Sequence, residues 1–297
     1  MTTLDIVNLH KSFGDTRALD GMSLSVRPGE IYGFVGSNGA GKSTTMRIAL
    51  GVLEADEGEV LFDAHPIDTS ARRRIGYMPE ERGLYGKEKI LEQLVFLGTL
   101  HGLANAEAEA NATELLTQLG LADRAADKVD DLSLGNQQRV QLAASLVHDP
   151  DILILDEPFS GLDPVAVDVM SQMLLTRARE RGIPVLFSSH QLDLVQRLCD
   201  RVGIVSQGRM VAEGTVAELR TRGPVRYEVV TDARGWYPAG TRVISDSPGR
   251  VVLEPTPDAT ADCDQLILQA ALAAGPVRSF SPVTPDLTEL FKEAVQP

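Results

Sequence analysis

The stretch that decides the fold is Gly36-Ser37-Asn38-Gly39-Ala40-Gly41-Lys42-Ser43-Thr44. An apolar run from Ile31 to Val35 precedes it, and a helical pattern from Lys42 to about Leu50 follows it. Glycines at this spacing let backbone N–H groups turn inward around phosphate oxygens, and a helix N-terminus favours negative charge. A strand, a glycine-rich loop and a helix in this order predict a nucleotide phosphate site, with a chance glycine-rich turn as the alternative.

Two side chains of this loop have distinct expected roles. Lys42 is expected to reach the β- and γ-phosphates, and the hydroxyl of Ser43 is expected to be a ligand of Mg²⁺. The other residues of the loop are predicted to cradle the phosphates through their backbone.

A second stretch, Asp151-Ile152-Leu153-Ile154-Leu155-Asp156-Glu157, reads as a buried strand that delivers two acids at its carboxyl end. Ligands of open α/β sheets bind at that end of the strands. We expect Asp156 to hold Mg²⁺ through water and Glu157 to polarise the attacking water. The alternative, a buried strand with incidental solvated acids, is disfavoured by the phosphate loop upstream.

Composition narrows the class of protein. The 297 residues are 43% hydrophobic and 24% charged, which is typical of a globular protein large enough for two domains. The net charge of −14 argues against a nucleic-acid partner, because such proteins usually carry a basic face. The two cysteines suggest neither a disulfide framework nor a zinc site.

No signal peptide and no apolar run long enough to span a bilayer is seen in the sequence, which favours the cytosol. Any role at a membrane would need a partner.

The spacing of apolar residues changes twice along the chain. Residues 88–147 follow a helical spacing of apolar residues and predict a mostly helical insert. Short apolar runs alternate with helical stretches elsewhere up to about residue 220, which predicts a largely parallel sheet covered on both faces. We therefore expect one α/β domain over residues 1–221.

Residues 222–297 are predicted to form a small α+β accessory domain. Strand-like segments at 225–230, 241–245 and 250–254 alternate with turns that contain proline and glycine. Helices are expected at 264–274 and 285–295, the second with Thr284 as N-cap and Pro285 at its first position.

Further motifs carry a family resemblance. The stretch Leu132-Ser133-Leu134-Gly135-Asn136-Gln137-Gln138-Arg139 resembles the signature sequence of ATP-binding cassette proteins. Ser160-Gly161-Leu162-Asp163 resembles their D-loop, His190 their switch histidine and Phe13 their adenine-stacking aromatic residue. The motifs follow the order of the family over roughly 180 residues.

The resemblance implies a P-loop NTPase cassette with a parallel-sheet core, an antiparallel β subdomain and a helical insert, which hydrolyses ATP with Mg²⁺. It also implies that two nucleotide domains pair head to tail. Ser133 and Gly135 would then contact the γ-phosphate in the other subunit, His190 would contact it in its own subunit, and Asp163 would help to join the two sites. Both half-sites are encoded here, which favours a homodimer but leaves a paralogous partner open.

Two departures from the family pattern stand out. Glu80 occupies the position of the usual Q-loop glutamine, where it can still face Mg²⁺ or its water, and Leu134 and Asn136 replace a glycine and a glutamine of the signature. These departures narrow the resemblance to one branch of the family. Together with the run from Pro79 to Tyr85 and the ending from Ser281 to Phe291, the two departures resemble the sodium-efflux and drug-resistance branch of exporter ATPases.

The leading hypothesis is an ATPase subunit that lies on the inner face of the cell membrane through a separately encoded permease and powers export of sodium ions or drug-like compounds. Residues from Glu80 to about Tyr85 are expected near the cytoplasmic helices of that permease. The alternative is a soluble cassette ATPase that acts in DNA repair or on ribosomes. Long heptad arms, a tandem cassette and a basic balance, which would favour it, are not seen in the sequence.

Overall fold

The computed structural model describes residues 2–81, 83–221, 225–260, 262–283, 287–289 and 291. It divides into two compact units, one ending at Thr215 and one beginning at Val216. The domain boundary expected at residue 222 lies among residues 222–224, which are outside the described part.

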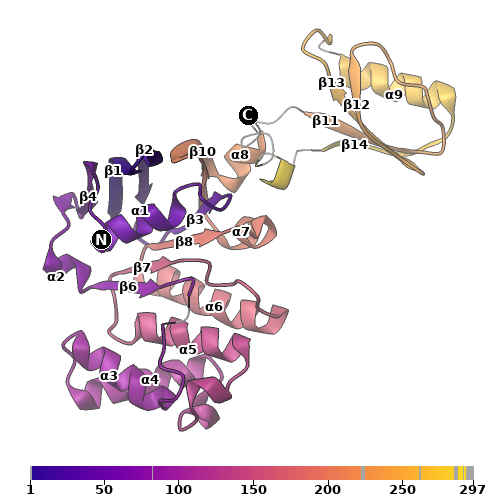
Figure 1. Ribbon diagram of the computed structural model, residues 1–297. Helices are drawn as coiled ribbons and strands as arrows, with labels where there is room; N and C mark the ends of the chain where they lie inside the picture. The colour runs from indigo at the N-terminus through magenta and orange to yellow at the C-terminus, as the bar shows by residue number, and fades with distance from the viewer. Residues whose placement is uncertain are drawn as a thin grey trace. The chain divides into compact units, whose positions relative to one another are not determined.

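A six-stranded sheet forms the centre of the first unit, in the order β10-β9-β3-β8-β7-β6 (Figure 1). Five strands run parallel, and only β10 pairs antiparallel, at one edge. The strands are β3 (Ile31–Gly36), β6 (Ile75–Met78), β7 (Ile152–Leu155), β8 (Val185–Ser189), β9 (Arg201–Ser206) and β10 (Arg209–Thr215). The predicted parallel core is therefore confirmed, with one antiparallel edge strand.

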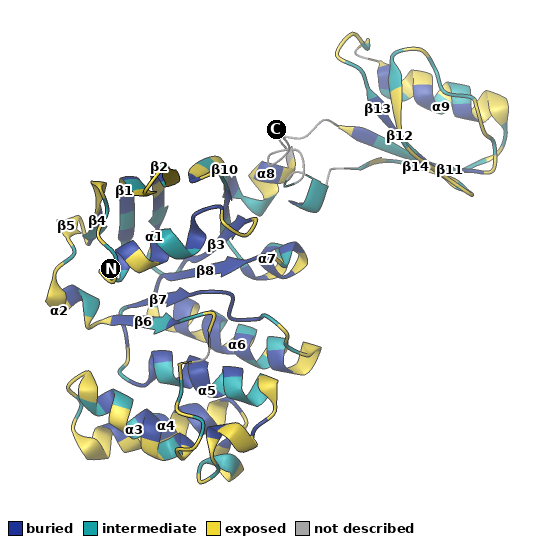
Figure 2. Ribbon diagram, in the orientation of Figure 1, coloured by how far each residue is buried: buried dark blue, intermediate teal, exposed yellow. Residues whose placement is uncertain are grey.

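The central strands are buried because they consist almost entirely of apolar residues. Every residue of β3, β7 and β8 is buried, as Figure 2 shows. The register pairs Ile31 with Val185 and Leu155 with Phe187, so these three strands end at nearly the same level. The segments that follow β3, β7 and β8 consequently lie close together at the carboxyl ends of these strands.

A second sheet of four antiparallel strands, in the order β2-β1-β4-β5, belongs to the same unit. Its first two strands extend well beyond the predicted segments 4–9 and 22–26. Residues between those segments continue the antiparallel pairing across the turn after Phe13. The strands are β1 (Leu4–Phe13), β2 (Thr16–Val26), β4 (Glu57–Phe62) and β5 (His65–Pro66).

Helices flank the central sheet, and three of them form the predicted insert. In Figure 1 this insert lies beside β6, at the edge of the sheet opposite β10. It comprises α3 (Ile90–Leu100), α4 (Asn105–Gln118) and α5 (Leu134–Leu146), with the 3-10 turns η1 (Ala122–Arg124) and η2 (Val129–Asp131). The remaining helices of the unit are α1 (Lys42–Ala49), α2 (Thr69–Arg72), α6 (Pro164–Arg181) and α7 (Leu192–Leu198).

The second unit begins with α8 (Val216–Thr221) and contains an antiparallel sheet in the order β12-β13-β11-β14. Helix α9 (Cys263–Ala274) packs Ile267 and Ala271 into a small core with Val229 and Leu253. The strands are β11 (Arg226–Thr231), β12 (Thr241–Ser247), β13 (Arg250–Pro255) and β14 (Val277–Val283).

The sequence had not indicated β14. It pairs with β11 along its whole length although Pro282 interrupts its apolar pattern. Thr284 and Pro285 of the expected last helix lie outside the described residues, and the described residues 287–289 and 291 within it are helical.

Candidate nucleotide site

A polar cavity of about 250 Å³ lies where the phosphate loop meets the carboxyl end of β7. Three separate segments of the sequence and one residue of β2 contribute to its wall. The described lining residues are Ala18, Asn38, Gly39, Ala40, Gly41, Lys42, Ser43, Thr44, Glu80, Asp156 and Glu157. Ten of the residues predicted from the sequence therefore share one cavity.

The phosphate loop keeps its shape because two of its glycines leave no room for a side chain. A Cβ atom at Gly36 would lie 2.7 Å from the carbonyl oxygen of Val205, and one at Gly41 would lie 2.7 Å from Leu19 Cδ2. Gly41 also has a φ of 106°, in the left-handed region, directly before helix α1. Gly39 has open space around it, but its φ of +79° favours glycine for the same conformational reason.

Lys42 is buried and bonded to its own loop. Its Nζ donates to the carbonyl oxygens of Gly36 at 2.7 Å and of Ser37 at 3.3 Å. Gly36 and Ser37 thus hold the lysine rather than line the cavity. A charged amine held at the N-terminus of helix α1 provides a point charge for phosphate oxygens.

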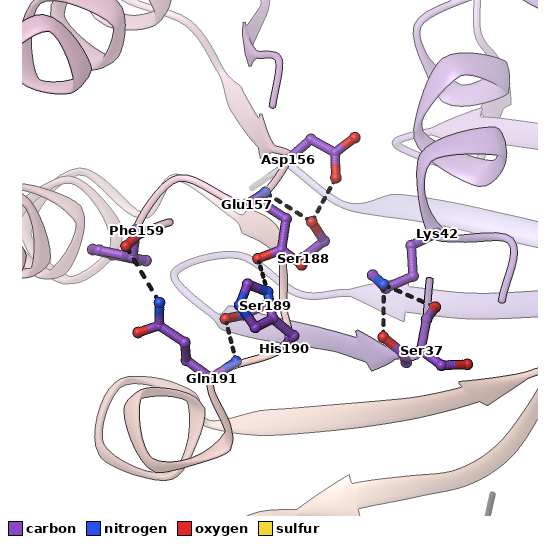
Figure 3. A network of polar contacts seen from close by, with 10 residues as sticks. Ser37, Lys42, Asp156, Glu157, Phe159, Ser188, Ser189, His190 and Gln191 are labelled. Atoms are coloured by element: carbon purple, nitrogen blue, oxygen red, sulfur yellow. Dashed lines mark hydrogen bonds and ion pairs between the residues drawn. The ribbon is translucent and has the colours of Figure 1, made fainter. Parts of the chain in front are cut away.

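The two acids after β7 are buried and held from β8, as Figure 3 shows. The hydroxyl of Ser188 donates to Asp156 Oδ1 at 2.6 Å and accepts from the backbone N–H of Glu157 at 2.8 Å. Glu157 has a φ of 49°, which is uncommon for a residue with a side chain. Such conformations are costly and gather at functional sites.

Glu157 is also bonded to His190. The His190 Nδ1 and Glu157 Oε2 atoms lie 2.8 Å apart, with the histidine side chain 58% exposed and the carboxylate side chain 8% exposed. The structure therefore brings the two predicted catalytic residues together, on segments that follow adjacent strands.

Glu80 enters the cavity from the loop after β6. Helix α5 holds that loop, because Gln141 Nε2 donates to the carbonyl oxygen of Pro79 at 2.6 Å. The residue at the Q-loop position is thus tied to the helical insert and faces the same cavity as Asp156.

The donor set of this cavity suits a magnesium–nucleotide complex. Glu80, Asp156 and Glu157 offer carboxylates and Ser43 a hydroxyl, against the one lysine among the lining residues. Within the described residues no group of three or more His, Cys, Asp or Glu side chains is placed to hold a metal ion alone. Mg²⁺ usually takes one or two carboxylates and completes its shell with phosphate oxygens and water.

The signature and D-loop residues lie outside this cavity. Ser133 caps α5 by accepting the N–H of Asn136, and Asp163 caps α6 by accepting the N–H of Ala166 at 2.8 Å. A Cβ atom at Gly135 would lie 3.7 Å from Asp163 Oδ2, so the two motifs are neighbours within one chain. None of Ser133, Gly135 and Asp163 is among the described residues that line the cavity.

Phe13 and Ala18 are two further residues at which the cavity differs from the prediction. Phe13 ends β1 with half of its surface exposed, and Lys11 Nζ lies 5.8 Å from its ring centroid. Phe13 is not among the lining residues, whereas Ala18 of β2 is. The sequence carried no signal for Ala18, a small residue in a strand.

Comparison with known proteins gives the family. Residues 19–160 match the family model described as ABC transporter. The uncharacterized ABC transporter ATP-binding protein YhaQ of Bacillus subtilis is 36% identical over 302 residues, which cover 99% of this chain and 98% of the relative. The chain belongs to the ATP-binding proteins of ABC transporters. It is therefore an ATPase with the fold of an ATP-binding cassette, and such subunits typically dimerise and pair with membrane permeases.

Another relative and a solved structure each match about three quarters of the chain. The linearmycin resistance ATP-binding protein LnrL of Bacillus subtilis is 37% identical over 74% of this chain and 71% of its own length. The dimeric structure of the bacterial cassette MJ0796 superposes with a TM-score of 0.66 at 27% identity, over 71% of this chain and 98% of that chain. No helix in the described part of this ABC subunit is long and apolar enough to cross a membrane.

Proposed function

We propose that this ABC subunit binds Mg²⁺–ATP in the cavity between the phosphate loop and β7, and that a second subunit completes the site. One observation supports this most strongly. The cavity contains Lys42, Glu80, Asp156 and Glu157, while Ser133 and Gly135, the signature residues, lie outside it. A hydroxyl and a side-chain-free backbone amide can both donate to a phosphate oxygen, so they suit the γ-phosphate of a neighbouring subunit.

Within one site the residues have separate roles. Lys42 and the loop N–H groups bind the phosphates, and Ser43, Glu80 and Asp156 hold Mg²⁺, which supplies charge stabilisation to the phosphates. Glu157 accepts a proton from the attacking water through its carboxylate. His190, bonded to Glu157, orients this carboxylate and turns toward the γ-phosphate when ATP is bound. Phe13 stacks on the adenine, and Asp163 helps to join the two subunits.

ATP then acts as a switch between two arrangements of the pair. A ligand shifts an equilibrium only by its differential affinity for the two states. Contacts of Ser133 and Gly135 with the γ-phosphate exist only in the closed pair, so ATP favours closure and hydrolysis favours opening.

An apolar surface beside the Glu80 loop supports coupling to a separately encoded permease. Tyr85 is 70% exposed and Phe96 54% exposed, and both line a cavity of about 340 Å³ with Glu88, Glu92 and Gln93. Gln93 fixes this surface, because its side chain accepts from the N–H of Tyr85 and donates to the carbonyl oxygen of Tyr85, both at 2.8 Å. Exposed aromatic residues around a groove suit an amphipathic helix of a partner.

The substrate class of the complete transporter follows from its relatives only by analogy. LnrL is named for linearmycin resistance, and a relative in Burkholderia lata, 38% identical over 71% of this chain, is named for Nod factor export. We infer an exporter, located at the inner face of the membrane through the permease, that carries drug-like compounds or sodium ions. The second unit is the accessory domain of this subunit.

Copurification tests the coupling. The full chain, isolated with detergent from its native cells, is expected to bring a membrane permease with it. The double variant Tyr85→Ser, Phe96→Ser should lose that permease while the purified chain keeps its ATPase rate. Val52→Ser, at a residue 76% exposed in the turn after α1, is the matched control and should keep the permease. Retention of the permease by the double variant would contradict the assigned surface, and copurification of nucleic acid alone would contradict the transport role.

A further inference from the structure

Ser188 is a polar residue in the most apolar part of the sheet. It follows Val185, Leu186 and Phe187 on β8 and has no exposed surface. Strand β8 lies between β3 and β7, the strands that lead to the phosphate loop and to the acids. A buried hydroxyl in such a strand needs hydrogen-bond partners, because burial without them is unfavourable.

The partners of Ser188 are the two acids of the site. Its O–H donates to Asp156 Oδ1 at 2.6 Å, and its Oγ accepts from the N–H of Glu157 at 2.8 Å. Figure 3 shows both contacts, with Asp156 and Glu157 reached from the adjacent strand. One hydroxyl is therefore shared by the side chain of the predicted metal ligand and the backbone of the predicted base.

This arrangement fixes the direction of the Asp156 carboxylate. With Oδ1 held by Ser188, the carboxylate cannot rotate freely about its last bond, and no described residue is hydrogen-bonded to Oδ2. Removal of a group that orients a metal ligand commonly lowers metal affinity or activity by about 10- to 100-fold.

The same hydroxyl holds Glu157 in its unusual backbone conformation. The φ of 49° at Glu157 needs support from its surroundings, and the bond from its N–H to Ser188 supplies part of that support. The conformation directs the side chain toward His190, to which it is bonded at 2.8 Å.

We propose that Ser188 is a positioning residue of the ATPase site, which orients Asp156 toward Mg²⁺ and fixes the backbone from which Glu157 acts. This inference rests on the proposed metal site. It predicts a defect that depends on Mg²⁺, whereas a merely structural serine would affect binding with and without the metal equally.

Titration calorimetry of the full chain with the non-hydrolysable analogue AMP-PNP, in EDTA and in Mg²⁺, separates these cases. Ser188→Ala should bind AMP-PNP in EDTA with the affinity of the wild type. The gain in affinity that Mg²⁺ gives should be about 10- to 100-fold smaller in this variant than in the wild type. Ser188→Thr, which keeps the hydroxyl, should retain the gain. Ser145→Ala is the matched control, because Ser145 is a buried serine whose hydroxyl bonds to Leu142 within α5.

An equal gain from Mg²⁺ in Ser188→Ala and Ser145→Ala would overturn the inference. Asp156→Asn, measured in parallel, distinguishes this from failure of the metal site. If Asp156→Asn loses the gain and Ser188→Ala keeps it, only the role of Ser188 is wrong; if both keep it, the metal site is wrong as well. Should Ser188→Ala not fold, Ser188→Cys replaces it, and its weaker hydrogen bonds should give a smaller loss of the same gain.

Discussion

His190 Nδ1 and Glu157 Oε2 lie 2.8 Å apart, so the histidine that follows β8 is bonded to the acid that follows β7. The bond joins an exposed side chain to a buried one. The bond gives the buried carboxylate a defined direction, while the histidine ring is exposed at the site. This pair is the centre of the proposed hydrolytic site.

Loss of either member should affect hydrolysis more than binding. Glu157→Gln keeps the size of the side chain but removes the base, so kcat should fall by at least ~10²-fold with ATP affinity retained. His190→Ala should also lower kcat with little change in KM. Steady-state ATPase kinetics together with equilibrium ATP binding check both. A near-wild-type rate for Glu157→Gln would exclude Glu157 as the base.

Lys42→Ala should act on binding instead. The variant removes the point charge for the phosphates and also the bonds that tie the loop to the carbonyls of Gly36 and Ser37. ATP affinity should fall by at least ~10-fold, in keeping with the strength of charge-assisted hydrogen bonds. Lys89→Ala is a control, because Lys89 is exposed and pairs with Glu92. Unchanged ATP affinity in Lys42→Ala would contradict the phosphate-loop assignment.

Glu80→Gln restores the residue usual in the family and removes one negative charge from the cavity. If Glu80 is a ligand of Mg²⁺, the concentration of Mg²⁺ for half-maximal ATPase rate should rise several-fold, with binding in EDTA unchanged or improved. Glu81→Gln, at the exposed neighbouring residue, should leave the Mg²⁺ dependence as it is. Identical Mg²⁺ curves for the two variants would remove Glu80 from the metal site.

The junction of the helical insert with β6 should make stability depend on pH. His148 stacks on His101 with ring centroids 3.7 Å apart and bonds to the carbonyl oxygen of Ile75 at 3.2 Å. Burial, and to a lesser degree the charge of His101, lowers the pKa of His148 from 6.5 to about 4. The folded state thus favours neutral His148. The contribution of this preference to the free energy of unfolding is fully present above pH 6.5 and is lost as the pH falls toward 4.

Linkage between these pKa values gives a loss of about 2 kcal/mol in the free energy of unfolding between pH 7.5 and pH 5. Urea unfolding at several pH values measures it. His148→Phe, which keeps an aromatic ring for the stack, should have a flatter pH dependence over this window. The same slope in both proteins would show that His148 does not carry the effect.

The sequence predicted what depends on neighbouring residues. The phosphate loop, the strand before Asp156 and the helical insert each show a local pattern, and each is confirmed in the fold. The edge strand β10, which pairs with the strand directly before it, was not predicted because it has a single buried residue and no long apolar run. The strand β14 was not predicted because pairing partners distant in the sequence decide it. For β14 those partners lie on β11, some fifty residues earlier.

The same reason explains what was missed in the site. Ser188 bonds to acids 31 and 32 residues away, and only the parallel pairing of β7 with β8 brings them together. The one signal in the sequence was a serine at the end of an apolar run. Ala18 gave no signal at all, since it reaches the cavity through the antiparallel sheet.

The central claim, that one chain holds only half of each ATP site, is tested most directly by the mass of Glu157→Gln in solution. With Mg²⁺–ATP, light scattering should show the 32.0 kDa chain shift to twice its mass, because bound ATP is not hydrolysed and keeps the pair closed. Adding Ser133→Arg should abolish the shift while ATP still binds, since Ser133 lies outside its own cavity. A Glu157→Gln chain that binds ATP and stays monomeric, or a double variant that dimerises equally well, would contradict the account.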